Sequence, residues 1–312
     1  MTGPMDKIGI LLNPSAGKGK ALKKKARLER LLKKWGVPFD LTVSASEENL
    51  RALTRDFIGQ YRCLAGAGGD STFQIIIEEI ARSGAEVDFG LIGLGSSNDV
   101  TREFDLDGLE KACRALNRRI ARPIDLGVVE DNGAALRYFI GQANIGLGAR
   151  VNRYVEEISG KRPRLAGCQS LAGTMGIIRS FRRKEVPLHL TIRADGQKRE
   201  GRYVVANFSN IRFWATGRML SPSARPDDGL LDGCLIKECS FLRLAHLALL
   251  ARKGKHVGAP EIEFLRCQEY EISSERGFEV QVDGEIIGGF RTPQSFKRIC
   301  IRTVPRSLRL IC

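Results

Sequence analysis

The sequence contains no apolar run long enough to cross a bilayer, which takes about 20 helical residues. Its most apolar stretch, residues 242–251, is interrupted by Arg243 and His246. The N-terminal residues also lack the apolar core of a secretory signal. We therefore expect a cytoplasmic protein.

Metal-binding and disulfide patterns are also missing. The chain has only three histidines, and its eight cysteines form no Cys-x-x-Cys pair. This spacing disfavours a zinc site and a disulfide framework, because both need Cys or His ligands at short, regular intervals. We expect reduced thiols with mostly structural roles.

The common nucleotide fingerprints are absent as well. The turn at Gly17-Lys18-Gly19 lacks the upstream glycine and the following Ser or Thr of a Walker A loop, and no turn matches Gly-x-Gly-x-x-Gly with its downstream acid. Basic and aromatic residues do not interleave as in single-strand binders, so no nucleic-acid partner is expected. The net charge of +14 over 312 residues then favours an anionic lipid surface or a nucleotide.

Part of that charge lies on the segment after residue 20, which shows helical periodicity. Its apolar face carries Leu28, Leu31, Leu32 and Trp35, and the rest of the segment is rich in lysine and arginine between Lys23 and Lys34. The basic face is either an ordinary solvated face or a contact for an anionic membrane, and the same alternatives hold for the cluster at 179–184.

Three apolar strands in the first third of the chain each run into a turn of small residues and then a helix. These turns lie at 13–19, 66–72 and 93–99. In an open parallel sheet such turns gather at the carboxyl edge of the strands, where backbone N–H groups bind phosphate. Asp70 lies within the second turn and would repel phosphate, so it indicates either a site that also uses magnesium or a residue that only caps the following helix.

Beyond Ile124 the pattern changes to strands separated by turns, with one strand expected over 136–145 and helices over 165–181 and 241–251. We therefore expect a Rossmann-like N-terminal α/β domain of three layers with a mostly parallel sheet, followed by a mainly antiparallel β-sandwich. The expected boundaries are 1–123 and 124–301, with 302–312 packing back on the first domain.

Six motifs along the chain resemble those of the diacylglycerol kinase catalytic-domain family. The family includes bacterial diacylglycerol and other lipid kinases, is related to sphingosine and ceramide kinases, and is distantly similar to NAD kinases. The motifs are Asn13-Pro14-x-x-Gly17-x-Gly19, Gly68-Gly69-Asp70-Ser71-Thr72, Gly95-Ser96-Ser97-Asn98-Asp99, Ile124-Asp125-Leu126-Gly127, residues 222–232 and Asp283-Gly284-Glu285.

The resemblance implies transfer of phosphate from ATP, with Mg²⁺, to a lipid hydroxyl. It implies Glu285 as the base, and Asp70 as a residue acting on the catalytic magnesium or as the base. It implies a structural magnesium on Asp228 and the backbone carbonyls of Arg225 and Leu230. The implied nucleotide-binding residues are Asn13, Pro14, Gly17, Ser44, Gly68, Gly69, Asp70, Ser71, Thr72, Ser96 and Asn98.

Two of these motifs are predicted to be turns from their residues alone: Asp227-Asp228-Gly229, and Asp283-Gly284-Glu285, which is predicted to be the turn of a hairpin. The second turn departs from the family pattern: Ser71 replaces a glycine, Gln74 stands for Asn, and Ile75 replaces Glu. If the backbone at Ser71 keeps φ > 0, its Cβ costs on the order of 1 kcal/mol.

Two alternatives to a lipid kinase follow: a family member that binds nucleotide or lipid without catalysis, and an NAD-kinase-like enzyme with a soluble acceptor. The acceptor lipid and the oligomeric state, a homodimer included, stay open.

Overall fold

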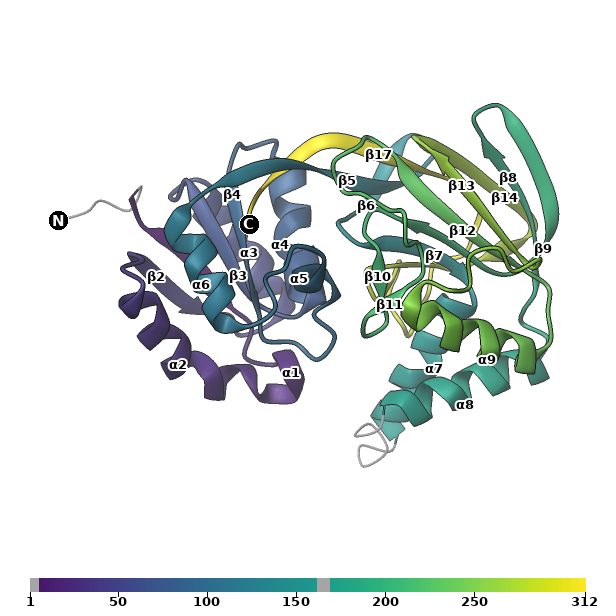
Figure 1. Ribbon diagram of the computed structural model, residues 1–312, viewed down its shortest axis with the longest axis horizontal. Coiled ribbons are helices and arrows are strands. Elements are labelled where there is room, and N and C mark those ends of the chain that lie inside the picture. Colours follow the sequence, from purple (N-terminus) through teal and green to yellow (C-terminus); the bar gives the residue numbers. More distant parts are fainter. Residues whose placement is uncertain (1–5, 162–168) are drawn as a thin grey trace.

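The computed structural model describes residues 6–161 and 169–312. Its first half alternates strands and helices (Figure 1). The strands are β1 (Ile8–Leu12), β2 (Phe39–Val43), β3 (Cys63–Gly68) and β4 (Asp88–Gly93), and the helices are α1 (Ala16–Gly19), α2 (Ala21–Lys34), α3 (Glu47–Ile58), α4 (Asp70–Ser83), α5 (Asp99–Glu103) and α6 (Leu109–Arg118).

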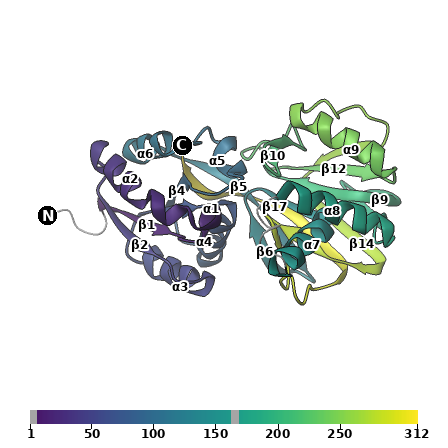
Figure 2. The same ribbon diagram turned by 90° about the horizontal axis from the view of Figure 1, so that it is seen from below.

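All of these strands pair in parallel, in the order β2-β1-β3-β4. Helices α2 and α6 cover one face of the sheet and α3 and α4 the other, which gives the expected three layers (Figure 2). Strand β1 is buried along its whole length, as a parallel strand covered on both faces must be. Ser46 caps α3, accepting a hydrogen bond from the Asn49 N–H at 3.1 Å.

The second half is mainly antiparallel, as expected. Its strands are β5 (Ala121–Asp131), β6 (Ala134–Phe139), β7 (Gln142–Gly146), β8 (Leu188–Ala194), β9 (Gln197–Ser209), β10 (Phe213–Trp214), β11 (Arg218–Met219), β12 (Leu231–Lys237), β13 (Ile262–Cys267), β14 (Glu269–Phe278), β15 (Val280–Val282), β16 (Glu285–Ile286) and β17 (Phe296–Ile311). Its helices are α7 (Leu147–Lys161), α8 (Gln169–Arg182), α9 (Phe241–Leu250) and the 3₁₀ turn Ala251–Lys253.

Two expectations for this half were wrong. The strand expected over 136–145 is divided into β6 and β7 by Ile140 and Gly141, whose N–H groups bind a side chain instead of a neighbouring strand. Helix α7 was not expected; its apolar residues pack against α8 and the sheet. Residues 165–168 of the helix expected over 165–181 lie outside the described residues.

Two long strands, β5 and β17, connect the halves. They pair antiparallel with each other, and the last residues of β17, Arg309–Ile311, pair in parallel with Asp88–Gly90 of β4. The sheet of the first half therefore continues into the sandwich (Figure 1). The domain boundaries proposed above stay a prediction. In the described parts of the chain, no helix is both long and apolar enough to cross a membrane.

Candidate active site

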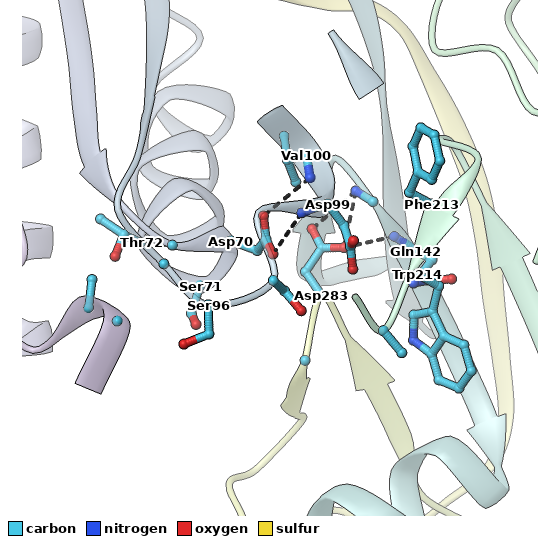
Figure 3. A pocket seen from close by; sticks show the side chains of 18 of the residues that line it. Asp70, Ser71, Thr72, Ser96, Asp99, Val100, Gln142, Phe213, Trp214 and Asp283 are labelled. Atoms are coloured by element: carbon cyan, nitrogen blue, oxygen red, sulfur yellow. Dashed lines mark hydrogen bonds between the residues drawn. The ribbon is translucent and has the colours of Figure 1, made fainter. Parts of the chain in front are cut away.

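A cavity of about 640 Å³ lies between the two halves, and all three small-residue turns of the first half border it (Figure 3). The residues that these turns contribute are Asn13, Ser15, Ala16, Gly17, Lys18, Gly69, Asp70, Ser71, Thr72, Gly95, Ser96, Ser97 and Asp99. Those that the second half contributes are Gly141, Gln142, Asn152, Ile211, Phe213, Trp214, Ala215, Gln281, Asp283 and Gly284. The expected gathering of the turns at the carboxyl edge of the sheet is therefore present.

Direct contacts hold the three turns together. The Asn13 side chain donates to the Thr72 hydroxyl at 3.0 Å, which links the first turn to the second. The Gly95 N–H donates to the Gly68 carbonyl at 3.1 Å, which links the second to the third. A Cβ built on Gly95 would lie 2.6 Å from the Gly69 Cα, so the chains approach here in a way that only glycine permits.

Asp70 is the first residue of α4, but its carboxylate does not cap that helix. Gly69 is the N-cap, and the Asp70 carboxylate accepts from the N–H groups of Asp99 and Val100, both at 3.2 Å, at the start of α5. Burial, with a contribution from the nearby Asp99 carboxylate, raises the pKa of Asp70 to about 6. The carboxylate thus joins two turns while facing the cavity.

Asp283 is the second acid on the cavity wall. Its carboxylate accepts the N–H groups of Ile140, Gly141 and Gln142 at 3.0, 3.0 and 2.7 Å. Burial raises the pKa of Asp283 to about 6, opposed by these three hydrogen bonds and assisted by the charge of Asp70. The two most perturbed carboxyls of the cavity therefore come from opposite halves of the chain (Figure 3).

The expected hairpin at 283–285 is present, because β15 and β16 pair antiparallel around Asp283 and Gly284. Gly284 borders the cavity, and its carbonyl accepts from the Asn152 side chain of α7 at 3.0 Å. Glu285, the expected base, follows directly as the first residue of β16 and is half-buried.

Helix α5 fastens the aromatic wall of the cavity, a feature that the sequence did not indicate. Its Asp99 accepts from the N–H groups of Thr216 and Gly217 at 3.0 and 2.7 Å. Glu103, also on α5, accepts from the backbone N–H and the guanidinium of Arg212, both at 2.9 Å. These bonds hold the β10–β11 hairpin, which carries Phe213 and Trp214, against the first half.

The expected nucleotide-binding residues fall into two groups. Those that border the cavity are Asn13, Gly17, Gly69, Asp70, Ser71, Thr72 and Ser96. Pro14 and Gly68 lie within the same turns without bordering it, and Asn98 is the N-cap of α5, in the left-handed region. Ser44 is buried at the end of β2, where its N–H donates to the Leu12 carbonyl at 2.9 Å.

The expected strain at Ser71 is absent. Ser71 lies in the first turn of α4 and is not among the residues with positive φ, so its Cβ costs nothing there. Ile75 is buried in the core of the first half. Gln74 is buried too, and its amide group donates to the Glu78 carboxylate at 3.4 Å.

The cavity fits a magnesium–phosphate group by the chemistry of its donors. Asp70, Asp283 and Gln142 present oxygen atoms, which are the ligands Mg²⁺ prefers, and within the described residues the buried Gln142 Oε1 has no hydrogen-bond partner. No group of three His, Cys, Asp or Glu in the described parts of the chain could hold a metal ion. A magnesium ion here would therefore keep water or phosphate oxygens as further ligands.

The second expected metal site, at Asp228, lies away from the cavity. One Asp228 oxygen accepts from the Leu230 N–H at 3.1 Å and the other is paired with Arg266. Arg266 Nε also lies 3.6 Å from Asp232, whose pKa burial raises to about 6 while Arg266 opposes the rise. A guanidinium thus neutralises these acids in this structure, and a magnesium ion on Asp228 would have to displace it.

Comparison with known families follows the same division of the chain. The model described as the diacylglycerol kinase catalytic domain matches residues 7–129, and the model described as the YegS C-terminal NAD kinase beta sandwich-like domain matches residues 141–312. The chain belongs to the diacylglycerol kinase catalytic-domain family.

Members of this family with curated names match over most of the chain. A protein named diacylglycerol kinase from Staphylococcus carnosus is 27% identical over 297 residues, covering 92% of this chain and 90% of its own length. A protein named probable lipid kinase YegS-like from Pseudomonas aeruginosa is 30% identical over 234 residues, covering 73% and 72%. A crystal structure of a diacylglycerol kinase from Bacillus anthracis has a TM-score of 0.68 at 16% identity, covering 98% of this chain and 96% of that one, and so shares the fold.

Proposed function

We propose that the chain is an ATP- and Mg²⁺-dependent kinase that phosphorylates the hydroxyl of a lipid. The observation that carries this proposal is the convergence of three phosphate-competent turns with Asp70 and Asp283 in one cavity between the two halves. Phosphoryl transfer depends on positioned phosphates, a neutralising cation and a carboxylate beside the acceptor, and this cavity offers residues for each.

The residues of the three turns would hold the nucleotide phosphates. The N-terminus of α4 lies at the cavity, where the helix dipole favours an anion, and Lys18 adds positive charge to the cavity wall. Magnesium, when bound, would offset the charge that builds up on the transferred group, with Asp70 and Asp283 as its protein ligands. Ionisation of both acids would be favoured by that cation.

Glu285 would act as the base for the acceptor. It follows Gly284 at the cavity edge, on a hairpin that Asp283 fixes through three backbone hydrogen bonds. In the transfer, the acceptor O–H gives its proton to the Glu285 carboxylate while its oxygen bonds to the γ-phosphorus. The bond from that phosphorus to the β–γ bridging oxygen breaks, which leaves ADP.

A lipid acceptor is supported by the names of the relatives and by the apolar wall that Ile211, Phe213 and Trp214 form. We further propose a peripheral, cytoplasmic enzyme that meets anionic membranes at their surface. The basic face of α2, where Lys23, Lys24, Arg27, Arg30 and Lys33 are exposed, supports such a contact.

The test is transfer of label from γ-labelled ATP to a total lipid extract. The wild type should give labelled lipid that requires Mg²⁺, Glu285→Gln should abolish it, and Glu110→Gln, at an exposed residue of α6, should leave it unchanged. Nucleotide binding without any product would favour a catalytically inactive member. Label found only in a water-soluble product would favour an NAD-kinase-like enzyme.

A further inference from the structure

Helix α9 presents an exposed apolar face. Leu242 is 78% exposed and Leu249 is 61% exposed. These two residues are seven positions apart and so lie on the same face of the helix, and Ala245 between them is exposed too. The opposite face buries Leu244 and Leu247 in the core shared with β9 and β12. Two polar residues interrupt the helix: Arg243, which pairs with Glu261, and His246, which is exposed and lies on the same face as Leu242 by its spacing of four residues. The remaining exposed side chains of this face are apolar, and a concentration of such side chains marks an interaction site.

Further exposed apolar side chains lie outside α9, on the segment that follows it and on α8. Val257 follows the helix and is exposed, and Met175 and Ile178 are exposed on α8. The two helices are joined where the rings of Phe181 and Phe241 meet at a centroid distance of 6.1 Å. Exposed apolar side chains gathered on neighbouring helices mark interaction sites.

Basic side chains follow both helices, although Arg179 and Arg243 within the helices pair with Glu157 and Glu261. Segments 169–184 and 240–257 contain no Asp or Glu. Their exposed basic residues that make no ion pair within the described part of the chain are Arg182, Arg183, Lys184, Arg252, Lys253 and Lys255. An apolar centre with a positive border complements an anionic lipid bilayer, into which an interfacial helix inserts its apolar face.

We propose that α9, with the exposed part of α8, docks the protein on an anionic lipid bilayer. This inference rests on the proposed function, because it names the surface through which a lipid kinase would reach its acceptor. A second copy of the chain fits less well, since a symmetric contact would place the two basic borders against each other.

The position of this surface suits delivery of a lipid to the cavity. Helix α8 packs on α7, and α7 carries Asn152, which borders the cavity and holds Gly284. Helices α7, α8 and α9 lie together at one end of the second half (Figure 1). A bilayer against α8 and α9 would thus be two helices away from the cavity edge.

The experiment is sedimentation of the full chain with vesicles in the absence of ATP. The vesicles contain phosphatidylcholine alone or with about 30% phosphatidylglycerol. The wild type should bind the anionic vesicles and release them as salt rises from about 50 to about 500 mM. The double variant Leu242→Asp/Leu249→Asp should bind about tenfold or more weakly. Ile120→Asp, at a residue 63% exposed on the first half, should bind like the wild type.

Equal binding by the double variant and the control would overturn the proposal. So would a solution dimer that the double variant dissociates, because the second copy would then be the cover. Matching thermal unfolding midpoints check that the variants are folded. Phosphorylation of lipid in detergent micelles is measured separately. If the wild type phosphorylates no lipid, the proposed function is wrong, whereas the vesicle experiment still tests docking on its own.

Discussion

The carboxylate of Asp99 on α5 accepts the backbone N–H of Gly217 at 2.7 Å, across the boundary between the two halves. The same carboxylate accepts the Thr216 N–H and pairs with Arg102. One side chain of the first half thereby fixes the loop that presents Trp214 to the cavity. The shape of the cavity depends on this attachment as much as on the turns that form its floor.

Replacing Asp99 by Asn should loosen that attachment. The amide keeps one acceptor but turns its NH₂ toward a backbone N–H, which leaves a buried donor unpaired and costs about 1–3 kcal/mol. Urea unfolding of the ligand-free protein measures the loss. Glu110→Gln, at an exposed ion pair with Lys34, serves as the control and should change the free energy of unfolding by less than about 0.5 kcal/mol. Equal stability of the two variants would count against the role of Asp99.

The raised pKa of Asp70 predicts a pH dependence of stability. Its pKa rises from 3.8 to about 6, so between these values the folded state binds more protons than the unfolded state. The free energy of unfolding contributed by Asp70 should therefore fall as pH rises from 4 to 6 and stay low above 6. Urea titrations across this window should show a shallower fall for Asp70→Asn than for the wild type. Parallel curves would show that Asp70 has an ordinary pKa.

The contact between Gly69 and Gly95 predicts that even a methyl group is excluded there. In Gly95→Ala the Cβ would lie 2.6 Å from a backbone atom, so the second and third turns must separate, at about 1–3 kcal/mol of stability. ATP affinity measured by calorimetry should fall with it.

Gly59→Ala is the matched control. Gly59 has a φ of −80°, and the nearest atom to its added Cβ would be 3.8 Å away. This variant should keep its affinity and its stability within about 1 kcal/mol. An unchanged ATP affinity in Gly95→Ala would mean that these turns do not hold the nucleotide.

Arg266 predicts how the site at Asp228 responds to magnesium. Arg266→Gln leaves the Asp228 and Asp232 carboxylates without their cation, and should cost about 1–2 kcal/mol at neutral pH. Because the variant removes a competitor for Asp228, Mg²⁺ should raise its unfolding temperature, relative to EDTA, more than that of the wild type. Arg298→Gln, at an exposed pair with Glu271, is the control. Equal magnesium shifts in all three proteins would contradict the competition.

The layers of the fold could be predicted because strand and helix patterns were strong locally. The three apolar strands expected before the turns at 13–19, 66–72 and 93–99 are present as β1, β3 and β4, since short runs of apolar residues mark buried parallel strands. The division at Ile140–Gly141 could not be predicted, because it depends on Asp283, which lies more than 140 residues further along the chain. No local pattern records such a partner.

The candidate site shows the same limit. Turns rich in glycine identified Asn13, Gly69, Asp70 and Thr72 because their chemistry is local. Asp283 belongs to the Asp283-Gly284-Glu285 motif, but Glu285 was the residue of that motif predicted to act, as the base. Its perturbed pKa arises only from burial in the folded chain. Trp214 carried no signal in the sequence, since its place on the cavity wall depends on Asp99.

The most direct measurement is a crystal structure with Mg²⁺ and a non-hydrolysable ATP analogue. The β- and γ-phosphates should lie against the turns at 13–18, 69–72 and 95–97, with the metal beside Asp70 and the γ-phosphate facing the hairpin that carries Glu285. Nucleotide bound outside this cavity, or phosphates directed away from Asp70 and Asp283, would contradict the proposed kinase site.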